Sequence, residues 1–222
     1  MLRCGIARVF YLDLDAHHGD GVQDAFAQEP RVFTLSIHEA GRWPMGRDGG
    51  AGETGGIDDR AGGEARNLPV PAGLNDTELA FLMNNAVLPL IEVFGPDAIY
   101  IQGGCDALAD DPQSKLELSN GALWRAVATV NNVTERLLVS GGGGYNPFTV
   151  GRCWAGIWAT LNGFHIPDTL PTAAEDLLRQ VRWRHRQGRQ PQAHWMTTLK
   201  DSPNPGPVRD AIKEITGKAL QA

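Results

Sequence analysis

Strand-like and helix-like patterns of apolar residues alternate along most of the chain. Short runs of β-branched and aromatic residues predict strands at residues 7–15, 32–37, 97–102 and 136–140, with a short extended piece at 67–71. Apolar residues at helical spacing predict helices at 20–28, 76–94, 119–135 and from about residue 147. This alternation indicates an α/β fold with a mostly parallel sheet.

Capping and helix-breaking residues mark several ends of the predicted helices. Asp20 and Ser119 are expected to cap the helices that follow them, and Gly95 and Pro96 end the helix before them. Residues 38–66 show little periodicity and contain nine glycines between Gly41 and Gly63. A loop of this length inside a compact domain is usually functional or disordered.

Length and composition fit one domain covering residues 1–222, and the Pro-, Arg- and Gln-rich tail, at about 166–222, is expected to form peripheral helices and loops around the core. Three widely spaced cysteines argue against a disulfide framework and favour a reducing, cytoplasmic setting. We see no signal peptide and no run of about 18 apolar residues, so we expect no membrane partner. The net charge of −6 makes nucleic acid an unexpected bulk partner.

Three polar clusters each follow a predicted strand directly. They are residues 13–21, 103–106 and 141–146. Ligands bind beyond the carboxyl ends of the strands in open parallel sheets. We therefore expect all three clusters along one edge of the sheet.

Asp15 and His17 stand two residues apart, so in an extended chain they point the same way and can reach one metal ion. Carboxylate and imidazole both suit zinc, and Asp106 is a candidate third ligand that leaves one position open. The alternatives are a hydrogen-bonded Asp15–His17 pair at a strand end and a turn carboxylate at Asp106.

Tyr145 follows four consecutive glycines, which allow a tight turn and close approach to a ligand. Its hydroxyl is placed to donate a hydrogen bond to developing negative charge on oxygen. The alternative is a glycine-rich turn followed by a surface aromatic residue.

Four collinear motifs, at residues 11–21, 34–38, 102–108 and 141–147, resemble the histone deacetylase family, and most closely its bacterial acetoin-utilisation members. The resemblance covers roughly residues 5–165. It implies the arginase/deacetylase three-layer α/β sandwich. It also implies hydrolysis of an acetyl-lysine, or of a related small N-acetyl amide, by metal-activated water.

By matching position, the resemblance implies zinc ligands at Asp15, His17 and Asp106, with Fe²⁺ as an alternative metal. It implies Tyr145 as the donor to the oxyanion and Trp43 as a wall of the substrate channel. Ser36, with backbone oxygens near Asp13, Asp15 and His17, matches a structural potassium site. The simpler alternatives are a rim aromatic for Trp43 and a backbone-bonded strand serine for Ser36.

The chain departs from the family because a tandem histidine pair, the family's general base and acid, would stand upstream of Asp15, where only about a dozen residues are present. We therefore expect a fold that is incomplete at its N-terminus, whose first strand exposes an unpaired edge and apolar surface. Asp13 and Asp20 match carboxylates that orient those histidines; alternatively they are a potassium ligand and a helix cap.

The other candidate bases, His18, His38, Glu39 and His165, match no catalytic position, and His18 is expected to be buried and hydrogen-bonded away from the metal. General acid–base help is worth about 10²–10⁴-fold, so the chain alone should be weakly active or inactive. The competing hypotheses are a catalytically dead fragment that binds metal or a partner, and an arginase-type metallohydrolase. The oligomeric state stays open.

A basic run from Arg179 to Arg189 contains five arginines interrupted by Trp183 and His185. Such a run can contact nucleic acid or an acidic partner. A single basic run in an acidic protein is more often a solvated face.

Overall fold

The structure is a computed structural model that describes residues 1–43 and 55–221. Its five strands form one all-parallel sheet of order β3-β2-β1-β4-β5. The strands are β1 (Val9–Asp13), β2 (Val32–Glu39), β3 (Ala65–Val70), β4 (Ala98–Gly103) and β5 (Leu137–Gly141).

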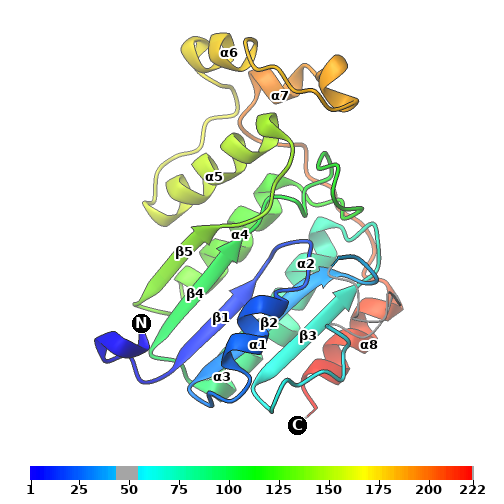
Figure 1. The fold of residues 1–222 in the computed structure, drawn as a ribbon. Helices are drawn as coiled ribbons and strands as arrows, with labels where there is room; N and C mark the ends of the chain where they lie inside the picture. The colour runs from blue at the N-terminus through cyan, green and yellow to red at the C-terminus, as the bar shows by residue number, and fades with distance from the viewer. Residues whose placement is uncertain (44–54, 222) are drawn as a thin grey trace.

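Helical segments connect the strands and extend the chain beyond the sheet. They are η1 (Leu2–Cys4), α1 (Asp20–Phe26), α2 (Asp76–Leu82), η2 (Met83–Val87), α3 (Leu88–Phe94), α4 (Asn120–Asn131), α5 (Pro147–Leu161), α6 (Thr172–Leu178), η3 (Gln187–Arg189), α7 (His194–Thr197) and α8 (Asp210–Ala219). Figure 1 shows α1 in front of the sheet and α2, α3 and α4 behind it. The predicted α/β sandwich with a parallel sheet is confirmed.

The central strand explains the core. Phe10 and Leu12 of β1 point to the layer of α2, α3 and α4, where they join Ile99 and Ile101 of β4 in the main apolar cluster. The intervening Tyr11 points to the opposite face, because successive strand residues alternate.

β1 is paired on both sides, with β2 and with β4. The expectation that the first strand leaves an unpaired edge is therefore wrong: the chain enters the sheet at its centre, and β3 and β5 are the edge strands. The expected apolar exposure lies instead on the front face, where a cavity of about 660 Å³ is lined by residues including Val9, Tyr11 and Tyr100.

Residues 76–94 were expected to form one helix, and they do so with a π-helical segment, η2, in the middle. Pro89 stands two residues after this segment, and because its ring has no N–H to donate and crowds the preceding turn of a regular α-helix, it accounts for the wider turn there. The segment is long and apolar enough to span a membrane by length and composition, but half of it is buried inside the fold, as in a core helix.

The sequence suggested that the last fifty residues are all peripheral, and the structure corrects this. Ile212 and Ala219 of α8 are fully buried and belong to the main apolar cluster, and α8 packs beside β3 and α2. The Asp20 cap is also corrected: Gly19 is the N-cap of α1, and Asp20 is its first residue. Ser119 does cap α4, accepting the N–H of Ala122.

Candidate metal and active site

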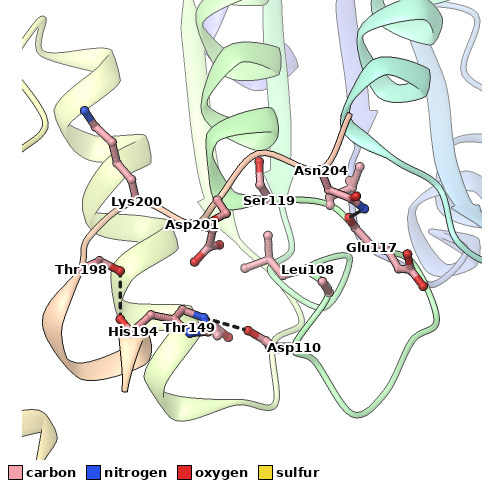
Figure 2. A pocket seen from close by; sticks show the side chains of 13 residues that line it. Leu108, Asp110, Glu117, Ser119, Thr149, His194, Thr198, Lys200, Asp201 and Asn204 are labelled. Atoms are coloured by element: carbon pink, nitrogen blue, oxygen red, sulfur yellow. Dashed lines mark hydrogen bonds and ion pairs between the residues drawn. The ribbon is translucent and has the colours of Figure 1, made fainter. Parts of the chain in front are cut away.

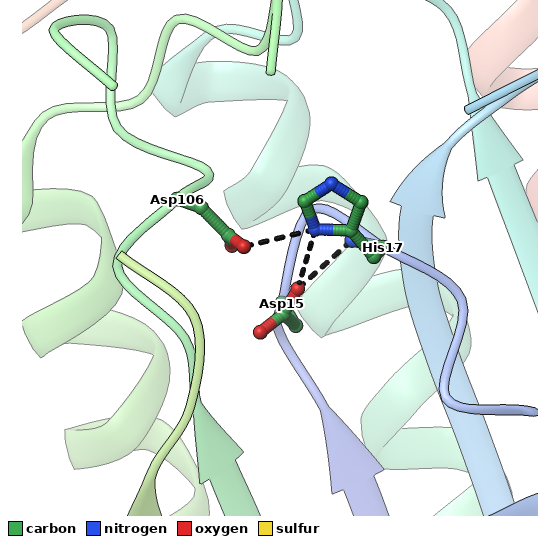
Figure 3. A group of neighbouring side chains, drawn as sticks. All are labelled: Asp15, His17 and Asp106. Atoms are coloured by element: carbon green, nitrogen blue, oxygen red, sulfur yellow. Dashed lines mark hydrogen bonds and ion pairs between the residues drawn. The ribbon is translucent and has the colours of Figure 1, made fainter. Parts of the chain in front are cut away.

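The three polar clusters meet at the carboxyl edge of the sheet, because β1, β4 and β5 are parallel neighbours that end side by side. Asp15 and His17 lie in the turn after β1, and Asp106 lies in the loop after β4. Figure 3 shows the three side chains pointing toward one another.

The cluster has the geometry of a small metal site. His17 Nδ1 lies 3.0 Å from Asp15 Oδ1 and 2.9 Å from Asp106 Oδ2. One potential ligand atom from each residue lies within 4.8 Å of the others. Two carboxylate oxygens and an imidazole nitrogen suit Zn²⁺ or Fe²⁺, with room for a further ligand.

In each of the two carboxylates, the oxygen that does not face His17 accepts further hydrogen bonds. Asp15 Oδ2 accepts hydrogen bonds from Gln102 Nε2 at 2.9 Å and from the Gly143 N–H at 2.7 Å. Asp106 Oδ1 accepts the N–H of Ala16 at 2.8 Å. The remaining oxygens are thereby fixed toward His17, so two backbone N–H groups and the Gln102 side chain orient the candidate ligands without a metal.

Two glycines make this packing possible. A Cβ at Gly143 would overlap Asp106 Oδ2 and lie 2.9 Å from Asp15 Oδ2. A Cβ at Gly104 would lie 2.5 Å from Asp15 Oδ2. These glycines therefore form a cradle around the carboxylates that a larger residue would fill.

The electrostatics of the cluster are unbalanced, because two carboxylates share one imidazole. Hydrogen bonds to Asp106 and Asp15 raise the pKa of His17 to about 10 against the opposing effect of burial. Burial and the charge of Asp15 raise the pKa of Asp106 to about 6. Burial also disfavours the charged form of Asp15, but hydrogen bonds from His17 and Gln102 outweigh it and lower its pKa. A divalent cation would offset this excess of negative charge.

Asp13 and Ser36 lie beside the cluster as register partners on β1 and β2. Asp13 accepts the Asp15 N–H at 3.0 Å and the Tyr11 hydroxyl at 2.9 Å, and burial raises its pKa to about 7. The Ser36 hydroxyl lies 2.9 Å from His38 Nδ1. Asp20 is not brought into the cluster; its carboxylate accepts the N–H of Gly21.

Tyr145 and Trp43 are the most exposed of the predicted site residues. Tyr145 is 49% exposed, and its N–H donates to Asp111 Oδ2 at 2.6 Å, which fixes its backbone beside the cluster. Burial, with the charges of Asp106 and Asp15, raises the pKa of its hydroxyl, which favours the protonated, hydrogen-bond-donating form. Trp43 is 69% exposed.

The other candidate bases make their hydrogen bonds elsewhere. His18 is buried with Nε2 3.1 Å from Gln23 Oε1, as expected, and His38 Nε2 lies 3.0 Å from the Gly55 carbonyl oxygen. Glu39 accepts two hydrogen bonds from Arg42 and the N–H of Lys115. His165 is exposed. Among the described residues, none of these four makes a hydrogen bond to Asp15, His17 or Asp106.

Sequence reasoning missed two supporting residues, Gln102 and Asp111. Gln102 bridges the loops, since its amide donates to Asp15 and its Oε1 accepts the Gly104 N–H at 2.7 Å. Its position as a polar residue near the end of an apolar strand was the available signal. Asp111 carried no comparable signal in the sequence.

Comparison with known proteins shows the family of the chain. The profile of the Histone deacetylase domain matches residues 1–161. Putative histone deacetylase 2 of Caenorhabditis elegans is 37% identical over 168 residues, which cover 74% of this chain and 32% of that protein. Histone deacetylase 1 of Homo sapiens is 33% identical over 168 residues, covering 74% and 33%.

Solved structures extend the match to the whole fold. A crystal structure of an HDAC homologue from Aquifex aeolicus aligns with a TM-score of 0.89 and 34% identity, covering 99% of this chain and 59% of that one. An HDAC homologue complexed with SAHA aligns with a TM-score of 0.87 and 35% identity, with the same coverage. The chain spans about a third of the two curated relatives and about three fifths of these solved chains. It belongs to the histone deacetylase family.

Proposed function

We propose that this chain supports hydrolysis of an acetyl-lysine or related N-acetyl amide, with Zn²⁺ held by Asp15, His17 and Asp106. The convergence of these three side chains inside the Gly104–Gly143 cradle carries the proposal. When bound, zinc polarises the acetyl carbonyl and makes a water molecule more acidic. Fe²⁺ suits the same ligands.

Tyr145 is proposed to donate its hydroxyl hydrogen to the carbonyl oxygen as that oxygen gains negative charge. Its raised pKa keeps this proton in place at neutral pH. Trp43 is proposed to line the path of the acyl-lysine. Asp13 and Ser36, adjacent across β1 and β2, are proposed to hold a structural K⁺.

A second candidate is a chain that binds metal or a partner with little turnover. The hydrogen bonding of His18 and His38 away from the cluster favours it, since neither is placed to accept a proton from water beside Asp106. Loss of general acid–base help is expected to lower the rate by about 10²–10⁴-fold.

Metal content by mass spectrometry, combined with turnover of a fluorogenic acetyl-lysine peptide, tests both candidates. We expect one zinc per wild-type chain, none in Asp106→Ala, and unchanged zinc in Tyr145→Phe. Turnover that is lost in Tyr145→Phe supports the deacetylase. Zinc without turnover supports the metal-binding form of the second candidate, and a wild-type chain that binds no zinc contradicts both the deacetylase and that form.

A further inference from the structure

The basic run identified in the sequence forms part of a pocket. Five of the chain's 20 lysines and arginines lie within residues 179–189, and no acidic residue occurs from residue 177 to 200. Arg179, Arg182, Arg184 and Arg189 line a cavity of about 430 Å³. We call these four side chains and their cavity the arginine pocket; its wall also includes Trp183 and Phe148.

The charge of the arginine pocket is largely uncompensated. Arg179 reaches Glu175 at 3.4 Å, an exposed contact of small energetic value. Within residues 1–43 and 55–221, Arg182, Arg184 and Arg189 form no ion pair with a carboxylate. In the described part of the chain, three of the four guanidinium groups that line the cavity therefore lack a carboxylate partner, and such groups attract an anion because a planar guanidinium pairs with a carboxylate in a bidentate manner.

The pocket is attached to the frame of the candidate site. Trp183 packs edge-on against the buried Trp195 with ring centroids 6.4 Å apart. Trp195 donates its indole N–H to Asp110 at 2.6 Å and stacks on Phe148 at 5.6 Å. Asp110 precedes Asp111, which holds the Tyr145 N–H, and Phe148 lies three residues after Tyr145.

Two further observations place the pocket at the same edge of the sheet as the candidate site. Figure 1 shows α6 and α7 beyond the beginning of α5, past the carboxyl ends of β4 and β5. Figure 2 shows the side chains of His194 of α7 and Asp110 in contact with each other at the wall of a neighbouring cavity of about 340 Å³, with His194 Nε2 3.4 Å from Asp110 Oδ2. Trp183, which lies among the arginines, is thus connected through Trp195 and Asp110 to the loop that holds Tyr145.

We propose that the arginine pocket binds acidic side chains next to the acetylated lysine of a protein substrate, which rests on the proposed deacetylase function. The pocket has room for one or two carboxylate side chains. The net charge of −6 on the whole chain works against a longer contact with a nucleic-acid backbone. The pocket therefore selects acetyl-lysines in acidic sequence contexts.

Binding of unacetylated peptides to the metal-free chain tests the pocket without requiring turnover. The probes are two fluorescein-labelled peptides of equal length, one with four glutamates around a central lysine and one with glutamines in their place. At low salt we expect the glutamate peptide to bind about tenfold more tightly, and added salt to remove the difference.

Arg184→Gln combined with Arg189→Gln should remove most of this preference. The control is Arg3→Gln combined with Arg136→Gln, which removes the same charge at the amino end of the sheet and should change affinity less than about twofold. Equal binding of both peptides, equal loss in both double variants, or tighter binding of a single-stranded oligonucleotide that depends on Arg184 and Arg189 overturns the proposal.

Turnover of the corresponding acetylated peptides separates this proposal from the proposed function. The Arg184→Gln/Arg189→Gln chain should show a KM about tenfold higher for the glutamate peptide with kcat unchanged. A KM that does not respond to the glutamates overturns the assignment to substrate. If neither peptide is turned over, the deacetylase proposal fails, and the binding experiment alone decides the ligand class of the pocket.

Discussion

Two buried acidic centres in this chain have opposite charge balances. Glu78 is fully buried and accepts hydrogen bonds from Arg209 Nε at 2.6 Å and Nη2 at 2.7 Å, together with the N–H groups of Arg209 and Asn75. At the carboxyl edge of the sheet, Asp15 and Asp106 share the single imidazole of His17. The first centre is neutralised within the chain, and the second is left with excess negative charge.

This difference separates a contact that stabilises the fold from one that binds a ligand. The Glu78–Arg209 pair joins α2 to the beginning of α8, 131 residues later. A permanently charged guanidinium group satisfies the carboxylate without any external ion. A divalent cation would neutralise the Asp15–His17–Asp106 cluster, and this excess of negative charge is the physical basis for proposing it as a metal site.

The largest expected effect is on metal affinity, in Gly143→Ala. The added methyl group would overlap Asp106 and crowd Asp15, so we expect zinc affinity to fall by at least about a hundredfold, beyond the 10–100-fold typical of an indirect perturbation. Isothermal titration with zinc measures this. Gly151→Ala is the control, because apart from the backbone of its own helix no atom of the described residues lies within 4 Å of its Cβ position; unchanged affinity in Gly143→Ala would contradict the cradle.

The next largest effect is on stability, in Arg209→Leu. This change leaves the buried Glu78 carboxylate without its cation, so the free energy of unfolding should fall by about 3 kcal/mol and Tm by about 6–12 °C. Glu78→Gln should cost less, because Arg209 is 36% exposed and can be hydrated. Equal, small losses in both variants would show that the pair contributes little.

The pH dependence of that loss has a defined sign. Burial raises the pKa of Glu78, but hydrogen bonds from Arg209 outweigh this and lower it below its usual 4.5. The ionised Glu78 therefore stabilises the folded chain fully above about pH 4.5. This stabilisation is lost as the pH falls through the lower pKa of Glu78 in the folded state. Urea titrations should show the stability gap between wild type and Arg209→Leu closing at acid pH; a gap independent of pH would contradict this.

The sequence predicted the Asp15–His17–Asp106 cluster better than the contacts that support it. All three residues follow strands, and the rule that parallel strands end at one edge places them on the same edge of the sheet. They come into contact because β1 and β4 are neighbours in the sheet. The order itself was not predictable from periodicity, so β1 was expected to expose an edge although it lies at the centre of the sheet.

Contacts between distant segments escaped prediction for a related reason. Glu78 and Arg209 are charged residues in polar surroundings of the sequence, and nothing local indicates that one is buried and bonded to the other. The burial of Ile212 and Ala219 likewise depends on where α8 docks, which is decided by β3 and α2 rather than by the tail itself.

Gln102→Leu tests whether a residue that only positions a candidate ligand affects metal affinity at the Asp15–His17–Asp106 cluster. Leucine cannot donate to Asp15 Oδ2 or accept the Gly104 N–H, so we expect zinc affinity to fall by about 10–100-fold with the fold retained. Tyr100→Phe, two residues earlier on the same face of β4, is the matched control. An affinity equal to that of wild type would mean that the Gly143 N–H alone orients Asp15.

The smallest effect should have the opposite sign to that of Arg209→Leu. In metal-free protein, Asp106→Asn removes one of two carboxylates that face each other while its side-chain oxygen still accepts the Ala16 N–H, so stability should rise by about 1 kcal/mol. Urea unfolding in the presence of a chelator measures this, with the exposed Asp58→Asn as control. A decrease comparable to that in Arg209→Leu would mean that the cluster is already neutralised within the chain, and that its charge imbalance cannot be what draws a metal ion to it.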